Sequence, residues 1–277
     1  MLTTPILLGL LSALTWGAGD FNGGLAVKRS NPYGVIAVAH SLSLLLLLIL
    51  VPIVGEPVPP LHDWLWGGAS GLAGGIGLVL LYRALAEGRM SVAAPVSAVV
   101  AAALPVLVGL LKDGLPGHWT LAGFALALAA VWLISGGEGL ALRFDDLRQP
   151  VIAGITFGAF FIFIERASQA ALIWPLIAVR IVSTSAMLGY ALLTRQDWIP
   201  KRESLVPVLL SSLLDTLGNA FYALSARTGR LDVAAVLGAL YPGATVLLAW
   251  VFLHERISRI QAIGIVLALS AIVMLTL

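Results

Sequence analysis

Long apolar runs, separated by short clusters of charged and turn-forming residues, make up almost the whole chain. Each run is close to the ~20 residues that a helix needs to cross the ~30 Å hydrocarbon core of a bilayer. We therefore expect an all-α integral membrane protein with ten transmembrane helices. The expected helices are residues 5–26, 34–54, 64–83, 91–111, 118–136, 150–170, 173–194, 204–224, 233–253 and 258–276.

The composition supports a protein whose surface is mostly covered by lipid. Hydrophobic residues make up 60% of the 277 positions and charged residues only 11%, whereas soluble globular chains have about 25% charged residues. The first run lacks a basic segment before it and is long enough to span, so it is interpreted as a retained helix rather than a signal peptide. We expect a monomer in the inner (cell) membrane of a bacterium, with the lipid bilayer as its main partner.

Several functional classes do not fit the sequence. The net charge of +2 is small and the basic residues are scattered, so nucleic acid is not an expected partner. There is no Cys and the four His residues are far apart, so neither a metal site nor a cofactor is expected. No hydrolase nucleophile motif is present, and we do not expect an enzyme.

A repeated phrase divides the chain into two halves. Residues 88–94 read Gly-Arg-Met-Ser-Val-Ala-Ala, and residues 229–235 read Gly-Arg-Leu-Asp-Val-Ala-Ala, at an offset of 141 (229 − 88). The sequence thus predicts one five-helix repeat at 1–136 and another at 150–277, joined by a connection at 137–149. The first helices of the repeats align at an offset of 145 instead, which matches Pro5 with Pro150, Gly9 with Gly154, and Asp20 with Glu165.

The charged loops indicate how the repeats are oriented. Because each repeat has an odd number of helices, two tandem copies must be inverted relative to each other. The loops after odd-numbered helices carry eleven Lys and Arg residues, and the other loops carry four. The positive-inside rule then places the odd loops in the cytoplasm and both termini on the extracytoplasmic side. Inverted repeats are typical of alternating-access transporters, whose binding site lies near the membrane midplane.

Three features are shared with one family of membrane proteins. They are Trp16-Gly17 in the first helix, the two Gly-Arg-x-x-Val-Ala-Ala phrases, and residues 253–258 (Leu-His-Glu-Arg-Ile-Ser) followed by Gln261 and Gly264. In these features the chain resembles the ten-helix EamA-type group of the drug/metabolite transporter superfamily over nearly its whole length. The first half departs from the pattern, with Lys112-Asp113 where a Glu would be usual. The resemblance implies a secondary transporter or exporter of small metabolites with a central cavity, and it leaves the substrate open.

Ionisable residues inside the expected helices are the first candidates for function. Such groups cost several kcal/mol in a membrane unless they are paired or line a wet cavity. The candidates are Asp20, His40, Glu165, Arg180 and Asp215. The three acids are candidates for proton coupling, since intramembrane carboxyl groups form the proton relays of pumps and transporters. In the competing interpretation, Arg180 neutralises one carboxylate, Glu165, as a structural ion pair.

A polar stripe runs along the eighth expected helix. Asp215, Asn219 and Tyr222 are spaced i, i+4 and i+7, so they share one helix face. This pattern favours a cavity wall for a small polar solute, and the alternative is a hydrogen-bonded seam between helices. The matching positions at an offset of 141 are Gly, Leu and Leu, so the halves are not expected to be functionally equivalent.

Aromatic and small residues add three further expectations. Trp16 and Asp20 lie one turn apart and could hold an amine by charge and cation–π attraction, with simple packing as an equal alternative. Tyr241-Pro242 should interrupt a helix and free a carbonyl for substrate or water, and Pro95 and Pro105 should act similarly in the fourth helix, although a kink set by packing is the simpler alternative. In the third helix, small residues at four-residue spacing predict close helix packing: Gly67, Gly71 and Gly75.

Three acids against one Arg favour a cationic or zwitterionic substrate. The expected protein is a secondary active transporter, an exporter or exchanger, of a small polar metabolite such as an amine or amino acid, coupled to protons through one of the three acids. Alternatives are a membrane sensor or accessory protein without flux, and a lipid-carrier flippase. The expected substrate-binding residues are Trp16, Asp20, His40, Arg180, Asp215, Asn219, Tyr222 and Tyr241.

Overall fold

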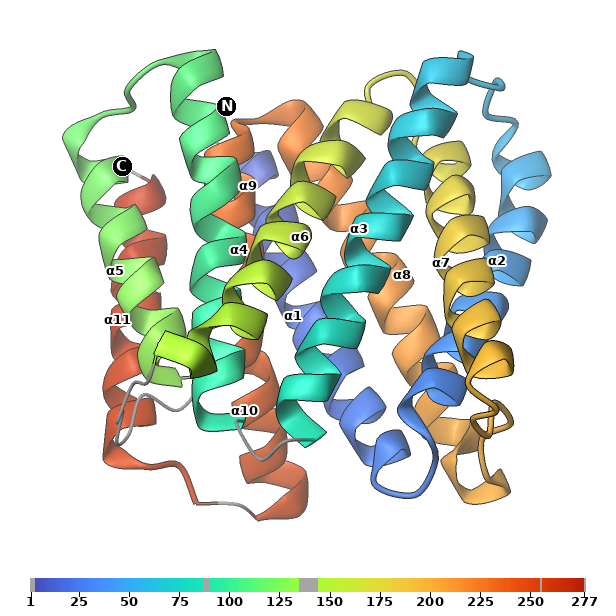
Figure 1. The fold of residues 1–277 in the computed structure, drawn as a ribbon. Helices are drawn as coiled ribbons and strands as arrows, with labels where there is room; N and C mark the ends of the chain where they lie inside the picture. The colour runs from blue at the N-terminus through green and yellow to red at the C-terminus, as the bar shows by residue number, and fades with distance from the viewer. Residues whose placement is uncertain (1–2, 87–89, 135–143, 255, 277) are drawn as a thin grey trace.

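The computed structural model describes residues 3–86, 90–134, 144–254 and 256–276, and these ranges are almost entirely helical, with no strand. Helix packs on helix throughout, and both ends of the chain lie toward the upper end in Figure 1. The elements are α1 Thr3–Val27, α2 Pro32–Val54, α3 Leu61–Ala86, α4 Met90–Asp113, α5 His118–Ile134, α6 Phe144–Ala167, α7 Ile173–Leu193, the 3-10 helix η1 Arg202–Ser204, α8 Leu205–Thr228, α9 Leu231–Gly238, α10 Tyr241–Leu253 and α11 Arg259–Thr276.

The expected run at 233–253 is two helices rather than one. α9 ends at Gly238 and α10 begins at Tyr241, with Pro242 in its first turn. Pro242 has no N–H to bond the carbonyl of Gly238, so the helical ladder is interrupted there, as expected. Pro105 likewise has no N–H for the carbonyl of Ala101, but α4 continues past it from Met90 to Asp113, so this proline removes one hydrogen bond without dividing the helix.

Some expected features lie wholly or partly outside the described residues. These are the start of the first repeated phrase (Gly88 and Arg89), Glu255, and much of the connection at 137–149. Its last part is helical, because α6 begins at Phe144 rather than at residue 150.

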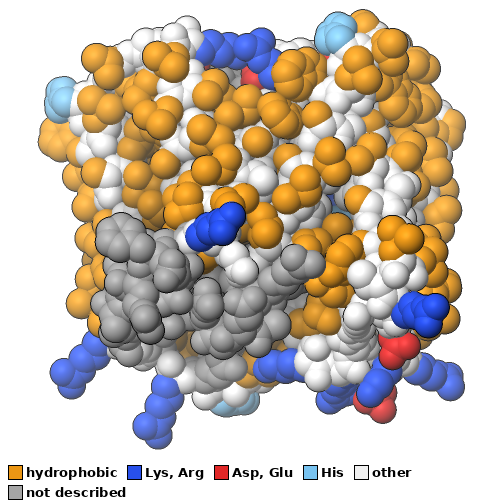
Figure 2. Space-filling view, viewed as in Figure 1, with side chains coloured by type: hydrophobic (Ala, Val, Ile, Leu, Met, Phe, Trp, Pro, Cys, Tyr) orange, Lys and Arg blue, Asp and Glu red, His pale blue; other side chains and the backbone are white. Residues whose placement is uncertain are grey.

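The described surface matches a lipid environment. Six segments are long and apolar enough to cross a membrane. Large apolar side chains face outward, including Leu193 (87% exposed) and Ile53 (73% exposed), which a soluble surface rarely presents over a wide area. Figure 2 shows a broad hydrophobic band with Lys and Arg gathered mainly along the lower edge and a smaller group at the upper edge. The six segments are 32–54, 96–113, 148–167, 173–193, 202–228 and 231–253.

The two halves pack on each other and their contacts repeat. α1 lies mainly against α8, α6 lies against α3 and α4, and α5 packs on α11. A Cβ added to Gly77 of α3 would touch Phe157 of α6, and one added to Gly218 of α8 would touch Trp16 of α1. These two contacts are related by the same offset of 141 (218 − 77 and 157 − 16).

The repeated contacts correct the expected alignment of the first helices. Gly17 of α1 lies against Tyr241 and Thr245, and Gly158 of α6 lies against Ala101 and Leu104. The offset is therefore 141 here too (158 − 17 and 245 − 104), and the offset of 145 is wrong. Identities between helices rich in Gly, Ala and Leu arise easily by chance, whereas close helix contacts do not.

The corrected alignment separates the two acids that seemed to correspond. Asp20 is equivalent to Phe161, and Glu165 is equivalent to Gly24. The proposed match between Asp20 and Glu165 therefore does not hold.

The close packing expected for the glycines of α3 is confirmed. A Cβ on Gly67 would lie 2.8 Å from the carbonyl oxygen of Pro175, and one on Gly71 would overlap the backbone of Val179. α3 can therefore approach the α7 backbone only because these positions lack side chains. This contact holds Arg180, the next residue of α7, beside the space between the halves.

Candidate functional site

A cavity of about 180 Å³ lies between the two halves. Asp215, on its wall, follows the start of α8 at Leu205 by ten residues, or about 15 Å at 1.5 Å per residue. That is about half of a ~30 Å hydrocarbon core, so the cavity lies near mid-depth. Its lining includes Trp16, Asp20, His40, Gly71, Gly74, Leu78, Phe157, Phe160, Phe161, Arg180, Ser183, Asp215, Asn219 and Tyr241.

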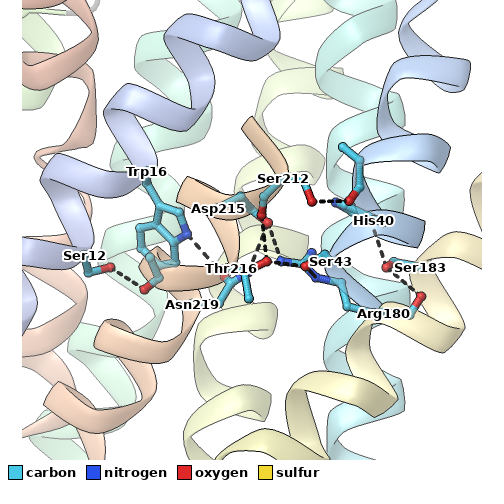
Figure 3. Close-up of polar contacts among 12 residues, drawn as sticks. Ser12, Trp16, His40, Ser43, Arg180, Ser183, Ser212, Asp215, Thr216 and Asn219 are labelled. Atoms are coloured by element: carbon cyan, nitrogen blue, oxygen red, sulfur yellow. Dashed lines mark hydrogen bonds and ion pairs between the residues drawn. The ribbon is translucent and has the colours of Figure 1, made fainter. Parts of the chain in front are cut away.

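One wall is a hydrogen-bonded polar network (Figure 3). Arg180 of α7 donates to the carboxylate of Asp215 on α8. Asn219, one turn further along α8, donates from Nδ2 to the same carboxylate at 3.2 Å. The indole nitrogen of Trp16 donates to Oδ1 of Asn219 at 3.3 Å. The network thus joins α1, α7 and α8 around a single ion pair.

Hydroxyl groups satisfy the other side of the guanidinium. Nε of Arg180 donates to Oγ of Ser43 at 2.9 Å, and Ser43 is hydrogen-bonded to Thr216 of α8. Arg180 is only 3% exposed, so its position is fixed by these partners and by Asp215. A buried charge with this many partners is well compensated.

His40 approaches the same wall from α2. Its Nδ1 lies 3.0 Å from Oγ of Ser183 on α7, and both side chains line the cavity. Arg180 and His40 therefore present cationic or hydrogen-bonding groups within the wall that also carries Asp215 and Asn219.

The expected partner of Arg180 was wrong. Arg180 pairs with Asp215, whereas Oε1 of Glu165 lies 3.1 Å from Nζ of Lys112 and accepts from Gln169 at 2.8 Å. Glu165 lies near the end of α6, where the long side chain of Lys112 reaches it from the last turn of α4. Lys112 was not a sequence candidate, since only the packing of α4 on α6 brings the two together.

Tyr222 lies behind the cavity wall rather than on it. Its side chain is fully buried, and its ring packs 4.8 Å from Phe161 and 5.5 Å from Trp16, measured between ring centroids. The hydroxyl donates to the backbone carbonyl of Phe161 at 3.3 Å. Of the predicted stripe, Asp215 and Asn219 face the cavity, and Tyr222 joins an aromatic cluster that supports Trp16.

Asp20 differs from the other acids. Its side chain lines the cavity and is exposed to it. Within the described residues it has neither a hydrogen-bond nor an ion-pair partner. Trp16, one turn away, directs its indole N–H to Asn219 and leaves this carboxylate free.

A second wall, next to Trp16, is apolar and aromatic. It is formed by Phe157, Phe160 and Phe161 of α6 with Gly74 and Leu78 of α3. Sequence reasoning missed these phenylalanines, because an aromatic run in a membrane helix carries no distinctive signal. The corrected repeat could have found them, since Phe157 is equivalent to Trp16 and Phe161 to Asp20. No group of three or more His, Asp or Glu side chains that could hold a metal occurs in the described residues.

The described residues form a helical bundle with an apolar, lipid-facing surface. A polar cavity lies near mid-depth between two similar halves. This combination is typical of a multi-pass membrane protein of the transporter class. The EamA-like transporter family profile matches residues 3–136 and again residues 150–277. The chain belongs to this family.

Comparison with other proteins adds a likeness of fold. A solved structure titled "Crystal structure of protein" is similar over 100% of this chain and 98% of its own, with a TM-score of 0.76 and 16% sequence identity. No curated protein matches the sequence.

Proposed function

We propose that the protein is a secondary active transporter that moves a small cationic or zwitterionic metabolite by alternating access. Ten transmembrane helices would form two inverted repeats, residues 1–136 and 150–277, joined at 137–149. Contacts that repeat when the halves are exchanged support this arrangement, as does a cavity near mid-depth between them.

The unpaired carboxylate of Asp20 carries the proposal. Arg180 and Asp215 compensate each other, so Asp20 leaves the cavity with one negative charge in excess. An isolated charge inside a membrane protein is unfavourable unless something neutralises it or water reaches it. A substrate cation can supply that neutralisation, which makes the site selective for an ammonium or similar group.

The two walls also indicate the shape of the substrate. A cationic group at Asp20 would place the rest of the molecule against Phe157, Phe160 and Phe161, whose rings favour apolar groups and cations. For a zwitterion, Arg180 and His40 lie on the wall that can donate to its carboxylate. These features support an amine or amino acid with an apolar side group.

Proton coupling is proposed to act through Asp20. Asp215 is held by Arg180, and Glu165 lies outside the cavity beside Lys112. Asp20 and Asp215 both line the cavity, but among the described residues only Asp215 is paired with a cation there. Asp20 is therefore the carboxylate proposed to take up either a proton or a substrate cation.

Uptake into proteoliposomes tests the proposal. Purified protein would be reconstituted and screened with radiolabelled amines and amino acids, with and without a pH gradient, after thermal-shift measurements have selected ligands. Asp20→Asn should abolish uptake driven by the gradient, whereas Asp197→Asn, at an exposed loop carboxylate, should not. Undiminished uptake by Asp20→Asn would contradict the assigned role of Asp20.

The same experiment separates the alternatives. Binding without flux would favour a sensor or accessory protein. A lipid-carrier flippase should have several cations along its path, and the described cavity lining carries one Arg. For orientation, the basic lower edge in Figure 2 supports a cytoplasmic location of that edge in a bacterial inner membrane, with both termini outside. We also propose that the protein is a monomer.

A further inference from the structure

The ends of four helices are joined by polar contacts at one end of the molecule. α4, α6 and α8 end there and α9 begins there, at the upper end in Figure 1. Lys112 of α4 pairs with Glu165 of α6. Arg230, which precedes α9, donates to the backbone carbonyl of Gly114 at 2.8 Å. Arg227 of α8 donates to the carbonyl of Ser168 at 3.3 Å.

The first two of these contacts cross between the halves. Glu165 is 3% exposed and Lys112 is 43% exposed, so the carboxylate is sealed and the ammonium group reaches it from the surface. The described cavity lining includes neither residue. The ion pair therefore lies beyond the cavity, between it and this end of the molecule.

The equivalent position at the other end has no such pair. At the offset of 141, Lys112 corresponds to Leu253 and Glu165 corresponds to Gly24, and neither can form an ion pair. A Cβ added to Gly24 would meet nothing within 4 Å, so α1 is loosely surrounded there. Asp20, one turn before Gly24, is exposed to the cavity.

We propose that Lys112 and Glu165 form a gate that holds the cavity closed at the end where α4 and α6 terminate, while the cavity is reached from the end near Gly24. This rests on the transport function proposed above. To open the closed end, α4 must move away from α6 and the ion pair must separate. The pair therefore favours the state seen here over the oppositely open state.

A cysteine reporter can follow the gate without a known substrate. The chain has no Cys, so a single introduced thiol is labelled without background. Ser168 is fully buried one turn after Glu165, and its hydroxyl has no hydrogen-bond partner. Ser168→Cys should therefore fold normally and react with a hydrophilic maleimide only when this end opens.

Labelling rates of the detergent-purified Ser168→Cys protein give the test. Lys112→Met should raise the rate at the introduced thiol on the order of tenfold, since it leaves Glu165 buried and unpaired in the closed state. Lys112→Arg keeps the charge and should label at the rate of the parent. Arg166→Met, which removes an exposed charge next to Glu165, should have no effect.

Charge reversal distinguishes a gate from general loosening. Lys112→Glu or Glu165→Lys alone should accelerate labelling, and the two together should return it to about the parent rate. A second reporter, Ala153→Cys in the fully buried middle of α6, should stay unlabelled in every folded variant. An unchanged rate in Lys112→Met, or a double reversal that labels as fast as the single ones, would overturn the gate.

The labelling result is independent of the transport result. Uptake in proteoliposomes combined with labelling that does not respond to Lys112 would reject the gate and keep the transporter. Responsive labelling in a protein that moves none of the screened compounds would keep a gated cavity and reject the proposed substrate class.

Discussion

Removing the buried Arg is the sharpest test of how the polar wall is held together. In Arg180→Met, Asp215 loses its cation and Ser43 loses its donor. Breaking a fully buried ion pair from one side costs about 3–5 kcal/mol. The side chain of Asp215 is 35% exposed, so water relieves part of this penalty and we expect about 2–3 kcal/mol.

That loss is measurable as a shift in melting temperature. For a chain of this size about 1 kcal/mol corresponds to ~2–4 °C, so Arg180→Met should melt roughly 5–10 °C below the parent in detergent. Arg259→Met, at an exposed Arg on α11, is the control and should melt within about 1–2 °C of the parent.

The double variant shows whether the ion pair is the cause. Arg180→Met combined with Asp215→Asn removes both charges of the pair and leaves neither partner unpaired, so it should recover most of the lost stability. If the double variant melts as low as the sum of the two single losses, the two side chains are not coupled and the reasoning fails.

Three further pairs of variants test separate contacts by melting temperature. Gly71→Ala should lower the free energy of unfolding by about 1–3 kcal/mol, because the new Cβ would overlap the Val179 backbone. Gly24→Ala is the control and should be neutral or stabilising, since there is open space around Gly24. Equal losses in the two variants would refute the packing argument. Glu56→Gln should lower the free energy of unfolding by about 1–2 kcal/mol. The carboxylate of Glu56 caps α7, since it accepts from the backbone amides of Leu172 and Ile173 at 2.6 and 2.7 Å. The control Glu203→Gln, in an exposed ion pair with Arg29, should cost less than about 1 kcal/mol. Thr184→Val should leave the free energy of unfolding unchanged or raise it, because the buried hydroxyl of Thr184 has no hydrogen-bond partner. Ser43→Ala should lower the free energy of unfolding by about 1.5–3 kcal/mol, because it removes an acceptor from Arg180. A larger loss in Thr184→Val than in Ser43→Ala would contradict this assignment.

The helices were predictable because apolar run length and charge position act locally. Boundaries such as Pro32–Val54 agree with the expected residues 34–54 within two positions, and the break before Tyr241 lies at the expected Tyr241-Pro242. The partners of charged residues were not predictable. Whether Arg180 meets Asp215 or Glu165 depends on which helix faces α7, and no spacing within one helix contains that information.

The repeat explains why the polar wall occurs in only one half. Arg180 corresponds to Ala39 and Asp215 to Gly74 at the offset of 141, so both members of the ion pair are absent from the first half together. Either charge without the other would carry a free-energy cost in a membrane interior, so the loss of both together costs less than the loss of one. The serine that accepts from Arg180 has a counterpart that keeps its hydroxyl, because Ser43 corresponds to Thr184 at the same offset. The counterpart of Arg180 is Ala39, whose side chain cannot donate a hydrogen bond to Thr184. Thr184 is left unsatisfied for that reason, and the asymmetry of the cavity follows from a charge pair that only one half contains.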